Sequence, residues 1–184
     1  MDATTLRQLQ APLKQQYKDD PASAATPLHA SGRTAEEGVS FTVDGWAGGV
    51  RAGLHPATGG DGGDACSGDM LLDAVLGCAG VTLRSVATAM GLGLRSATGE
   101  ATGSFDARGT LGLDREVAVG VSDLRLVFTV DSDADDTQLA KLAQLTERYC
   151  VVARSLATTP VIEIVRAGRA SPLTSGRPPV VPPA

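Results

Sequence analysis

Hydrophobic residues recur at two different spacings along the chain, and each spacing predicts a type of secondary structure. Near the start they fall at helical spacing, which predicts a leading helix over residues 5–17, interrupted by Pro12. A polar, proline-containing stretch at 19–27 then predicts a linker. Residues 39–56 have β character and are punctuated by glycines, which predicts a β-hairpin.

A long apolar helix is predicted next, over residues 69–90. In the three turns after Asp69 its one charged residue is Asp73, and such all-round apolarity predicts a central helix covered on nearly every side. Gly77 and Gly80 lower the intrinsic stability of this helix by roughly 1 kcal/mol each relative to Ala. We therefore expect another backbone to approach closely at these two glycines.

The second half of the chain alternates strands with one further helix. Strands are predicted over 95–107 and 115–130, and the second of these alternates apolar and polar residues as a half-buried antiparallel strand does. An acidic stretch then precedes a helix whose apolar face includes Cys150, and 158–167 is predicted as a final strand. This order of elements predicts an α+β fold with an antiparallel sheet.

These patterns divide the chain into three parts. Residues 1–25 are predicted to form the leading helix and linker, 26–167 one α+β domain, and 168–184 a proline-rich disordered tail. With 184 residues, the chain has the length of one ordinary domain that is large enough to enclose a core.

Net charge and the nature of the N-terminal segment disfavour several classes of function. A formal net charge of −5 and a pI near 4.9 disfavour nonspecific binding to nucleic acids or anionic membranes, which favour basic surfaces. No run of residues approaches the ~18 apolar residues of a membrane span, and the N-terminus lacks the apolar segment of a signal peptide. We therefore expect a cytoplasmic protein whose cysteines are reduced.

The three cysteines are the main candidates for chemistry. Cys78 and Cys150 occupy helix positions predicted to face inward, where a free thiol also serves as a small hydrophobic side chain. Cys66 lies in a glycine-rich segment and is expected to be an incidental exposed thiol. The three cysteines lack the closely spaced ligand pairs of structural zinc sites. His55 is expected to be a surface residue, with lining of an active site as the alternative.

Two stretches of the sequence carry a family resemblance. The segment "SGDMLLDAVLGCAGVTLRSVA", followed some seventy residues later by "ERYCVVARSL" and a final strand, is similar to the OsmC/Ohr family of osmotically inducible and organic-hydroperoxide-resistance proteins. The resemblance covers roughly residues 5–166 and implies an intertwined homodimer with two long central helices enclosed by antiparallel sheets. It also implies a thiol-dependent peroxidase that reduces organic (alkyl or lipid-like) hydroperoxides in the response to oxidative stress.

Carried over by position, the resemblance assigns Cys78 as the peroxidatic cysteine and Cys150 as the resolving cysteine. The family's carboxylate near the start of the central helix falls on Asp69, and its active-site arginine on Arg51, with Arg33 as the alternative. A thiolate among apolar side chains needs a nearby guanidinium to stabilise it, and a carboxylate holds that arginine in place. The second thiol captures the sulfenic acid as a disulfide before over-oxidation.

This chemistry requires no metal and no organic cofactor, but it needs an external thiol or dithiol reductant. Cys66 is the alternative resolving cysteine. Nine residues separate Asp69 from Cys78, which places them on opposite faces of one helix and roughly 13 Å apart along its axis. We therefore expect an obligate homodimer in which Asp69 and Arg51 reach across to the second copy's Cys78. The alternative function is a non-enzymatic dimer that holds an apolar small molecule in its interfacial cleft.

Overall fold

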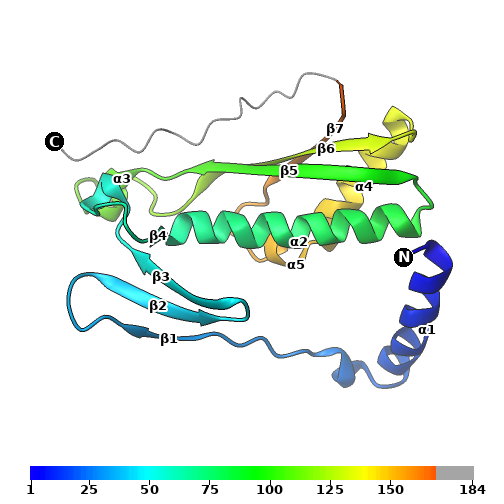
Figure 1. Cartoon of the computed structure of the whole chain (residues 1–184), viewed down its shortest axis with the longest axis horizontal. Helices are drawn as coiled ribbons and strands as arrows, with labels where there is room; N and C mark the ends of the chain where they lie inside the picture. The colour runs from blue at the N-terminus through cyan, green and yellow to red at the C-terminus, as the bar shows by residue number, and fades with distance from the viewer. Residues whose placement is uncertain (169–184) are drawn as a thin grey trace.

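Two β-sheets and a long central helix organise the chain, and in Figure 1 the sheets lie on either side of that helix. The computed structural model describes residues 1–168. The elements in chain order are α1 (Ala3–Asp19), η1 (Pro21–Ala24), β1 (Ser31–Thr34), β2 (Ser40–Gly45), β3 (Gly48–Gly53), η2 (Pro56–Thr58), β4 (Ala65–Cys66), α2 (Ser67–Ala89), β5 (Leu94–Ser104), α3 (Ala107–Thr110), β6 (Ser122–Ser132), α4 (Asp136–Tyr149), α5 (Val151–Arg154) and β7 (Val161–Arg166). The predicted α+β class is confirmed.

The second sheet, with strand order β5-β6-β7, carries the core of the chain. Strand β6 runs antiparallel to β5, as predicted, and parallel to β7. Its residues Leu126, Phe128 and Val130 are buried in a core that α2, α4 and β7 complete. Residues 115–121, predicted as the start of this strand, precede it in a loop. Gly120 interrupts the apolar pattern there, and glycine weakens a strand because it has no side chain to pack.

Helix α4 begins with a capping box, as the acidic stretch before it predicts. The side chain of Asp135 accepts a hydrogen bond from the Gln138 N–H, and the Gln138 side chain accepts one from the Asp135 N–H, both at 2.8 Å. The buried residues of α4 are Leu139, Leu142 and Thr146. Cys150 separates α4 from α5 and is fully buried, so its predicted inward position is confirmed.

Helix α2 is covered on one side by the described part of its own chain. Its buried residues recur every four positions and are Val75, Ala79, Leu83 and Ala87. On another face, Val81 has 73% of its surface exposed. A methyl group added to Gly80 would lie 3.8 Å from the Phe128 ring, whereas one added to Gly77 would meet nothing within 4 Å. The prediction that α2 is covered on nearly every side is therefore wrong for residues 1–168 of one chain, because no element among them packs on this face.

The composition of α2 also corrects the predicted absence of a membrane-span candidate. Over its best 18-residue window α2 has a mean hydropathy of 1.5, and it is the one helix among residues 1–168 long and apolar enough to cross a bilayer. A search for an unbroken apolar run does not find it, because Asp73 and the glycines interrupt the run. They do not lower the mean hydropathy of the window enough to exclude the helix. A core helix gives the same result, so this property is weak evidence for a membrane span.

The N-terminal part of the chain buries no residue. Helix α1 contains Pro12 and has no buried side chain. The predicted hairpin is present as β2 and β3, with β1 paired antiparallel to β2 and the short β4 parallel to β3. All residues of these four strands are exposed or half-buried, and Trp46 at the hairpin turn is fully exposed. This first sheet therefore has no core of its own.

The ends of the chain bear on the three-part division made from the sequence. The predicted linker at 19–27 contains the short 3₁₀ helix η1. Apart from Gly168, the predicted disordered tail at 168–184 lies outside the described residues. The boundaries of the three parts stay predictions.

Candidate thiol site

Helix α2 and the junction of α4 with α5 bring two cysteines together. Cys78 lies in the middle of α2 and is half-buried at the edge of the hydrophobic core that contains Cys150. Both cysteines are free thiols, and they lie near enough for Cys78 to influence the ionisation of Cys150. The hydroxyl of Thr82, one turn further along α2, donates a 2.8 Å hydrogen bond to the Cys78 carbonyl. The sequence expectation that these two helix positions meet agrees with this arrangement.

The surroundings of Cys150 favour its protonated form. Burial raises the pKa of the Cys150 thiol above its ordinary value, because the apolar core disfavours the thiolate. Backbone hydrogen bonds from Ala153 and Val152 lower the pKa in part, and the neighbouring Cys78 raises it again. A thiol in this state is a poor first nucleophile, and it needs an exposed, activated partner to react before it.

Cys66 lies apart from this pair. It is the residue that precedes α2, and its thiol is partly exposed. Cys78 lies twelve positions further along the chain, a distance of roughly 18 Å along the axis of α2. Within one chain, Cys66 therefore cannot exchange with the Cys78–Cys150 pair unless α2 unwinds.

The two candidate arginines lie in the first sheet and differ in their contacts. Arg51, on β3, donates from Nε to the Ser40 Oγ at 3.1 Å, and the same nitrogen lies 3.2 Å from the Asp64 carboxylate. Arg33, on β1, uses Nη1 to bind both carboxylate oxygens of Asp44, at 2.9 and 3.1 Å. Asp64 carried no signal in the sequence analysis, because its partner lies thirteen residues earlier in the chain.

Asp69 lies in the first turn of α2, as predicted, with an exposed side chain. Within residues 1–168 its carboxylate forms no hydrogen bond or ion pair, and no such contact joins Arg51 or Arg33 to Cys78. A single chain therefore assembles the two thiols but leaves the carboxylate and the arginines apart from them.

His55 has a structural setting. Its Nδ1 accepts a 3.0 Å hydrogen bond from the Ala57 N–H, and its ring packs edge-on against Phe105 with 5.2 Å between the ring centroids. These contacts fix the short turn η2 after β3. They hold His55 in this loop, and within residues 1–168 it forms no hydrogen bond with the thiols.

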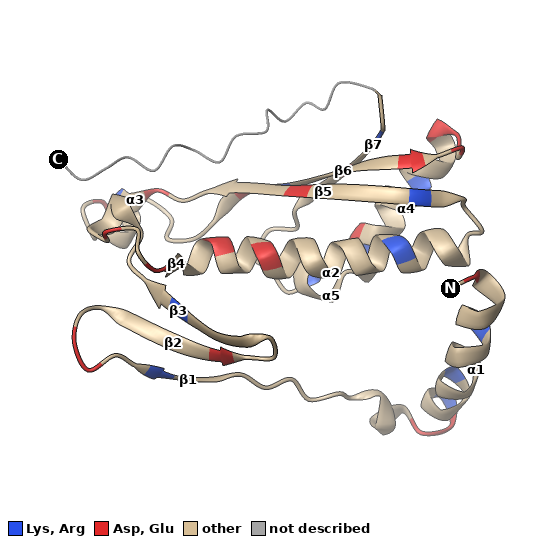
Figure 2. Cartoon of the chain, in the orientation of Figure 1, with Lys and Arg blue, Asp and Glu red and all other residues tan. Residues whose placement is uncertain are grey.

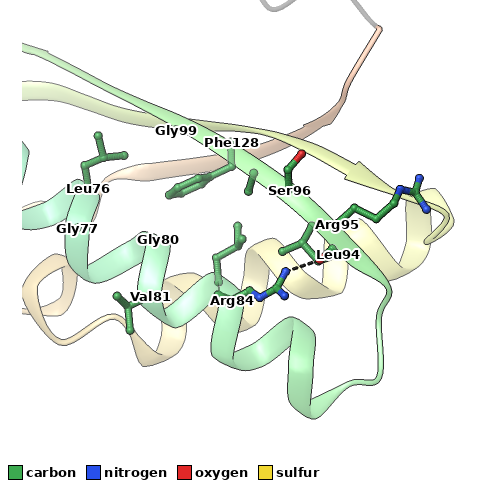
Figure 3. Close-up of a pocket in the computed structure, with 12 residues that line it drawn as sticks. Leu76, Gly77, Gly80, Val81, Arg84, Leu94, Arg95, Ser96, Gly99 and Phe128 are labelled. Carbon is green, nitrogen blue, oxygen red and sulfur yellow. Dashed lines mark hydrogen bonds between the residues drawn. The ribbon is translucent and has the colours of Figure 1, made fainter. Parts of the chain in front are cut away.

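An open apolar groove of about 540 Å³ runs between α2 and β5 (Figure 3). Leu76, Val81 and Phe128 line it, together with Gly77 and Gly80. Cations lie towards one end. Arg84 donates to the Leu94 carbonyl, whereas Arg95 binds the carboxylates of Asp131 and Asp133. Cys78 is not among the lining residues, so the groove and the thiol pair lie on different faces of α2.

The charges of α2 divide along its length (Figure 2). Its two carboxylates, Asp69 and Asp73, lie in the N-terminal half, and its one cation, Arg84, lies in the C-terminal half. Across the described part of the chain, no group of three His, Cys, Asp or Glu side chains is close enough to hold a metal ion.

Taken together, the fold and the site define an α+β protein with a thiol pair between a central helix and a second, broken helix. A family model for OsmC-like proteins matches residues 60–165, which is more than half of the chain and includes both cysteines. The chain belongs to the OsmC-like family, as the sequence resemblance predicts. No curated protein sequence matches it significantly.

Solved structures share this fold at low sequence identity. An OsmC-like protein of unknown function from Vibrio cholerae is 17% identical, with a TM-score of 0.63 over 77% of this chain and 100% of its own. An organic hydroperoxide resistance protein from Elizabethkingia anophelis is 10% identical, with a TM-score of 0.61 over 77% and 97%. The organic hydroperoxide resistance protein OhrB of Bacillus subtilis is 13% identical, with a TM-score of 0.54 over 77% and 98%. At these identities the similarity shows the fold alone.

Proposed function

We propose that this protein is a cytoplasmic, thiol-dependent peroxidase that reduces organic hydroperoxides. The observation that carries the proposal is the proximity of Cys78, half-buried on α2, and Cys150, buried at the start of α5. One thiol is accessible enough to meet a substrate, and the other is held nearby in its protonated form. The names of structural neighbours, organic hydroperoxide resistance proteins, agree with this chemistry.

The reaction begins at Cys78. Its thiolate attacks the distal oxygen of the hydroperoxide, the O–O bond breaks, and the leaving alkoxide takes up a proton to become an alcohol. Cys78 is then a sulfenic acid. Cys150 attacks this sulfur, which forms a disulfide and releases water. An external thiol or dithiol supplies the two electrons that restore both thiols, so the cycle uses no metal and no organic cofactor.

The substrate class follows from the surroundings of the thiols. Apolar side chains of the core border Cys78 on the inward side. Such a wall favours the alkyl part of an organic hydroperoxide over hydrogen peroxide, because burial of apolar surface stabilises the complex by roughly 25 cal/mol per Å². Alkyl or lipid-like hydroperoxides are therefore the proposed substrates.

We propose further that the active form is a homodimer in which two α2 helices pack antiparallel. The bare face of α2 contains Gly77 and Val81, and Gly77 leaves room for a second backbone. Antiparallel packing would also bring Asp73 of one copy close to Arg84 of the other, since the two residues lie on opposite sides of the helix centre near Cys78. This charge pattern supports the antiparallel arrangement over the parallel one.

In this dimer the first sheet of each copy serves the other copy's thiols. That sheet buries no residue in its own chain, which a sheet with no other partner would not tolerate. We assign Arg51 and Asp69 to the second copy's Cys78, where the guanidinium stabilises the thiolate. The contacts of Arg33 with both oxygens of Asp44 make it the weaker candidate.

The groove between α2 and β5 favours a second candidate function. Its apolar lining would suit a small apolar ligand, and a binding dimer of this fold would need no reactive cysteine. The two functions differ in whether the thiols turn over.

A peroxidase assay with cumene hydroperoxide and a dithiol reductant separates these functions. We expect turnover by the wild type, complete loss in Cys78→Ser, and retention in Cys66→Ser, the matched control. Mass spectrometry after one equivalent of peroxide should find a Cys78–Cys150 disulfide. First oxidation at Cys66, or equal turnover in the Cys78→Ser variant, would overturn the assignment. Cys150→Ser should leave Cys78 more prone to irreversible over-oxidation.

A further inference from the structure

The segment between β3 and β4 closes tightly and places Asp64 beside β3. The parallel pairing of the two strands aligns Ala52 with Ala65 and Gly53 with Cys66. A methyl group on Gly53 would lie 2.7 Å from both the Cβ and a carboxylate oxygen of Asp64, so the glycine makes room for this carboxylate. The Asp64 side chain is only 22% exposed. Its position is thus set by backbone pairing and close packing.

Two side chains hold Arg51 through a single nitrogen. Nε donates to the Ser40 Oγ on the neighbouring strand β2, at 3.1 Å, and lies 3.2 Å from Oδ1 of Asp64. In the part of the chain that the structure describes, neither Nη1 nor Nη2 of Arg51 donates to a protein acceptor. The guanidinium is planar and rigid, so contacts at Nε fix the direction in which the two terminal nitrogens point.

Arg33 shows the opposite arrangement. Its Nη1 donates to both carboxylate oxygens of Asp44 on β2, so its terminal end is neutralised within the first sheet. Arg51 is instead held at Nε, which leaves its two terminal nitrogens available to bind an anion. This difference separates two arginines that the sequence analysis left as alternatives.

We infer that Asp64, with Ser40, positions Arg51 so that its terminal nitrogens meet the second copy's Cys78 thiolate. The inference rests on the proposed function, and it gives Asp64 the arginine-holding role that the family resemblance assigned to the helix-start carboxylate. Asp69 forms no contact with Arg51 within the chain, whereas Asp64 contacts it at Nε. Asp64 is therefore a positioning residue that never touches the substrate.

Replacing Asp64 has opposite effects on the Cys78 thiolate depending on whether Asp64 acts through its charge or by positioning Arg51. Removing the negative charge of Asp64 would, by charge alone, make the surroundings of the thiolate more positive and lower the pKa of Cys78. Loss of the contact at Nε instead lets the guanidinium move away from the thiolate, which raises that pKa. Cys150 also titrates beside Cys78, as do Arg51 and Asp69 of the second copy in the proposed dimer. The measurement therefore uses Cys150→Ser chains that also lack Cys66.

The experiment measures the rate of Cys78 alkylation by iodoacetamide as a function of pH, together with kcat/KM for cumene hydroperoxide in chains that retain all cysteines. In Asp64→Asn we expect the pH profile of Cys78 alkylation to move to higher pH, with alkylation at pH 7 and kcat/KM each falling about tenfold. Arg51→Gln should match or exceed this change. Ser40→Ala should show part of the effect and Ser40→Thr, which keeps the hydroxyl, should show little. Asp61→Asn, in the same loop, is the matched control and should behave as wild type.

The outcomes separate this inference from the proposed function. An unchanged or lowered pKa in Asp64→Asn, while Arg51→Gln raises it, would overturn the positioning role and leave the peroxidase intact. A raised pKa in Asp69→Asn with none in Asp64→Asn would return the role to Asp69. If the wild type lacks peroxidase activity but both Asp64→Asn and Arg51→Gln raise the pKa of Cys78, the function fails and the positioning role stands. No effect of Arg51→Gln on that pKa overturns the inference.

Discussion

The two halves of this molecule differ in whether they enclose a hydrophobic core. The second sheet, α2, α4 and α5 enclose a continuous apolar core that includes Leu126, Leu142 and the Cys150 thiol. The first sheet and α1 contain strands and a helix of regular geometry but bury no side chain at all. Regular backbone pairing alone rarely stabilises so small a sheet in water. The half with the second sheet is thus complete in itself, whereas the half with the first sheet is incomplete in one chain, and in the dimer proposed above a second chain would stabilise it.

The largest expected effect comes from the complete half. Leu142→Ala removes a side chain that is 0% exposed, and we expect it to lower the free energy of unfolding by about 2–5 kcal/mol through lost burial and a residual cavity. Val50→Ala, on the hairpin, removes a side chain that is 42% exposed in the single chain. The cost of Val50→Ala should depend on protein concentration, because the second copy covers Val50 in the proposed dimer. The cost of Leu142→Ala should not, when compared at the same fraction of dimer. Urea unfolding at several concentrations measures both, and a concentration-independent loss for Val50→Ala would contradict the dependence of the hairpin on a partner.

Mixed dimers test whether the incomplete half serves the complete half of the other copy. Chains with Arg51→Ala and chains with Cys78→Ser should each be inactive alone. After random exchange, half of the dimers are mixed and each has one intact site of two, so about a quarter of the wild-type activity should return. Mass spectrometry of the intact dimers checks the exchange. If exchange occurs and activity does not return, both residues belong to the same chain's site.

Charge reversal on α2 sharpens the comparison at the face that the single chain leaves bare. Asp73→Lys should weaken the dimer about two- to tenfold, because it places like charges opposite each other when the helices pack antiparallel. Asp73→Lys combined with Arg84→Asp should restore most of the affinity, measured by sedimentation equilibrium. Asp61→Lys makes the same change of charge away from α2 and serves as the control. An equal effect in all three variants would favour a different packing of the helices.

The smallest expected effect is the pH dependence contributed by the buried thiol. The pKa of Cys150 is raised above its ordinary value of 9.0, chiefly by burial. Its contribution to stability is therefore fully present below pH 9 and is lost as the pH rises towards the folded-state pKa, because the unfolded chain ionises first. Under reducing conditions, wild type should lose stability between pH 9 and 10 more steeply than Cys150→Ala. Urea unfolding at several pH values measures this loss. If the free energy of unfolding falls equally steeply with pH in wild type and Cys150→Ala, this thiol is not held protonated.

The sequence predicts the complete half better than the incomplete one. The alternation in β6 and the capping residues of α4 act locally, so their pattern in the sequence is sufficient to predict a strand and a helix with Cys150 facing inward. The parallel pairing of β6 with β7 joins residues more than thirty positions apart and left no local signal. The apolar pattern of α2 predicted burial, but the pattern does not specify which chain supplies the cover.

The site divides in the same way. Cys78 and Cys150 were identified from helix positions and from the family pattern, and the structure places them together. Their catalytic roles stay predictions. The contact of Arg51 with Asp64 was missed, because it depends on how a glycine-containing loop closes against β3 and on the small volume of Gly53. Composition and spacing do not encode such a closure in any recognised motif.

The bare face of α2 has a consequence for the biosynthesis of this protein. A newly made chain leaves the ribosome with a helix apolar enough to be mistaken for a membrane segment, and with Val81 still uncovered. As long as it is uncovered, such a surface is a target for chaperones and for aggregation. If the proposed dimer covers this face, we expect the cell to hold very little unassembled chain and to degrade variants that assemble slowly.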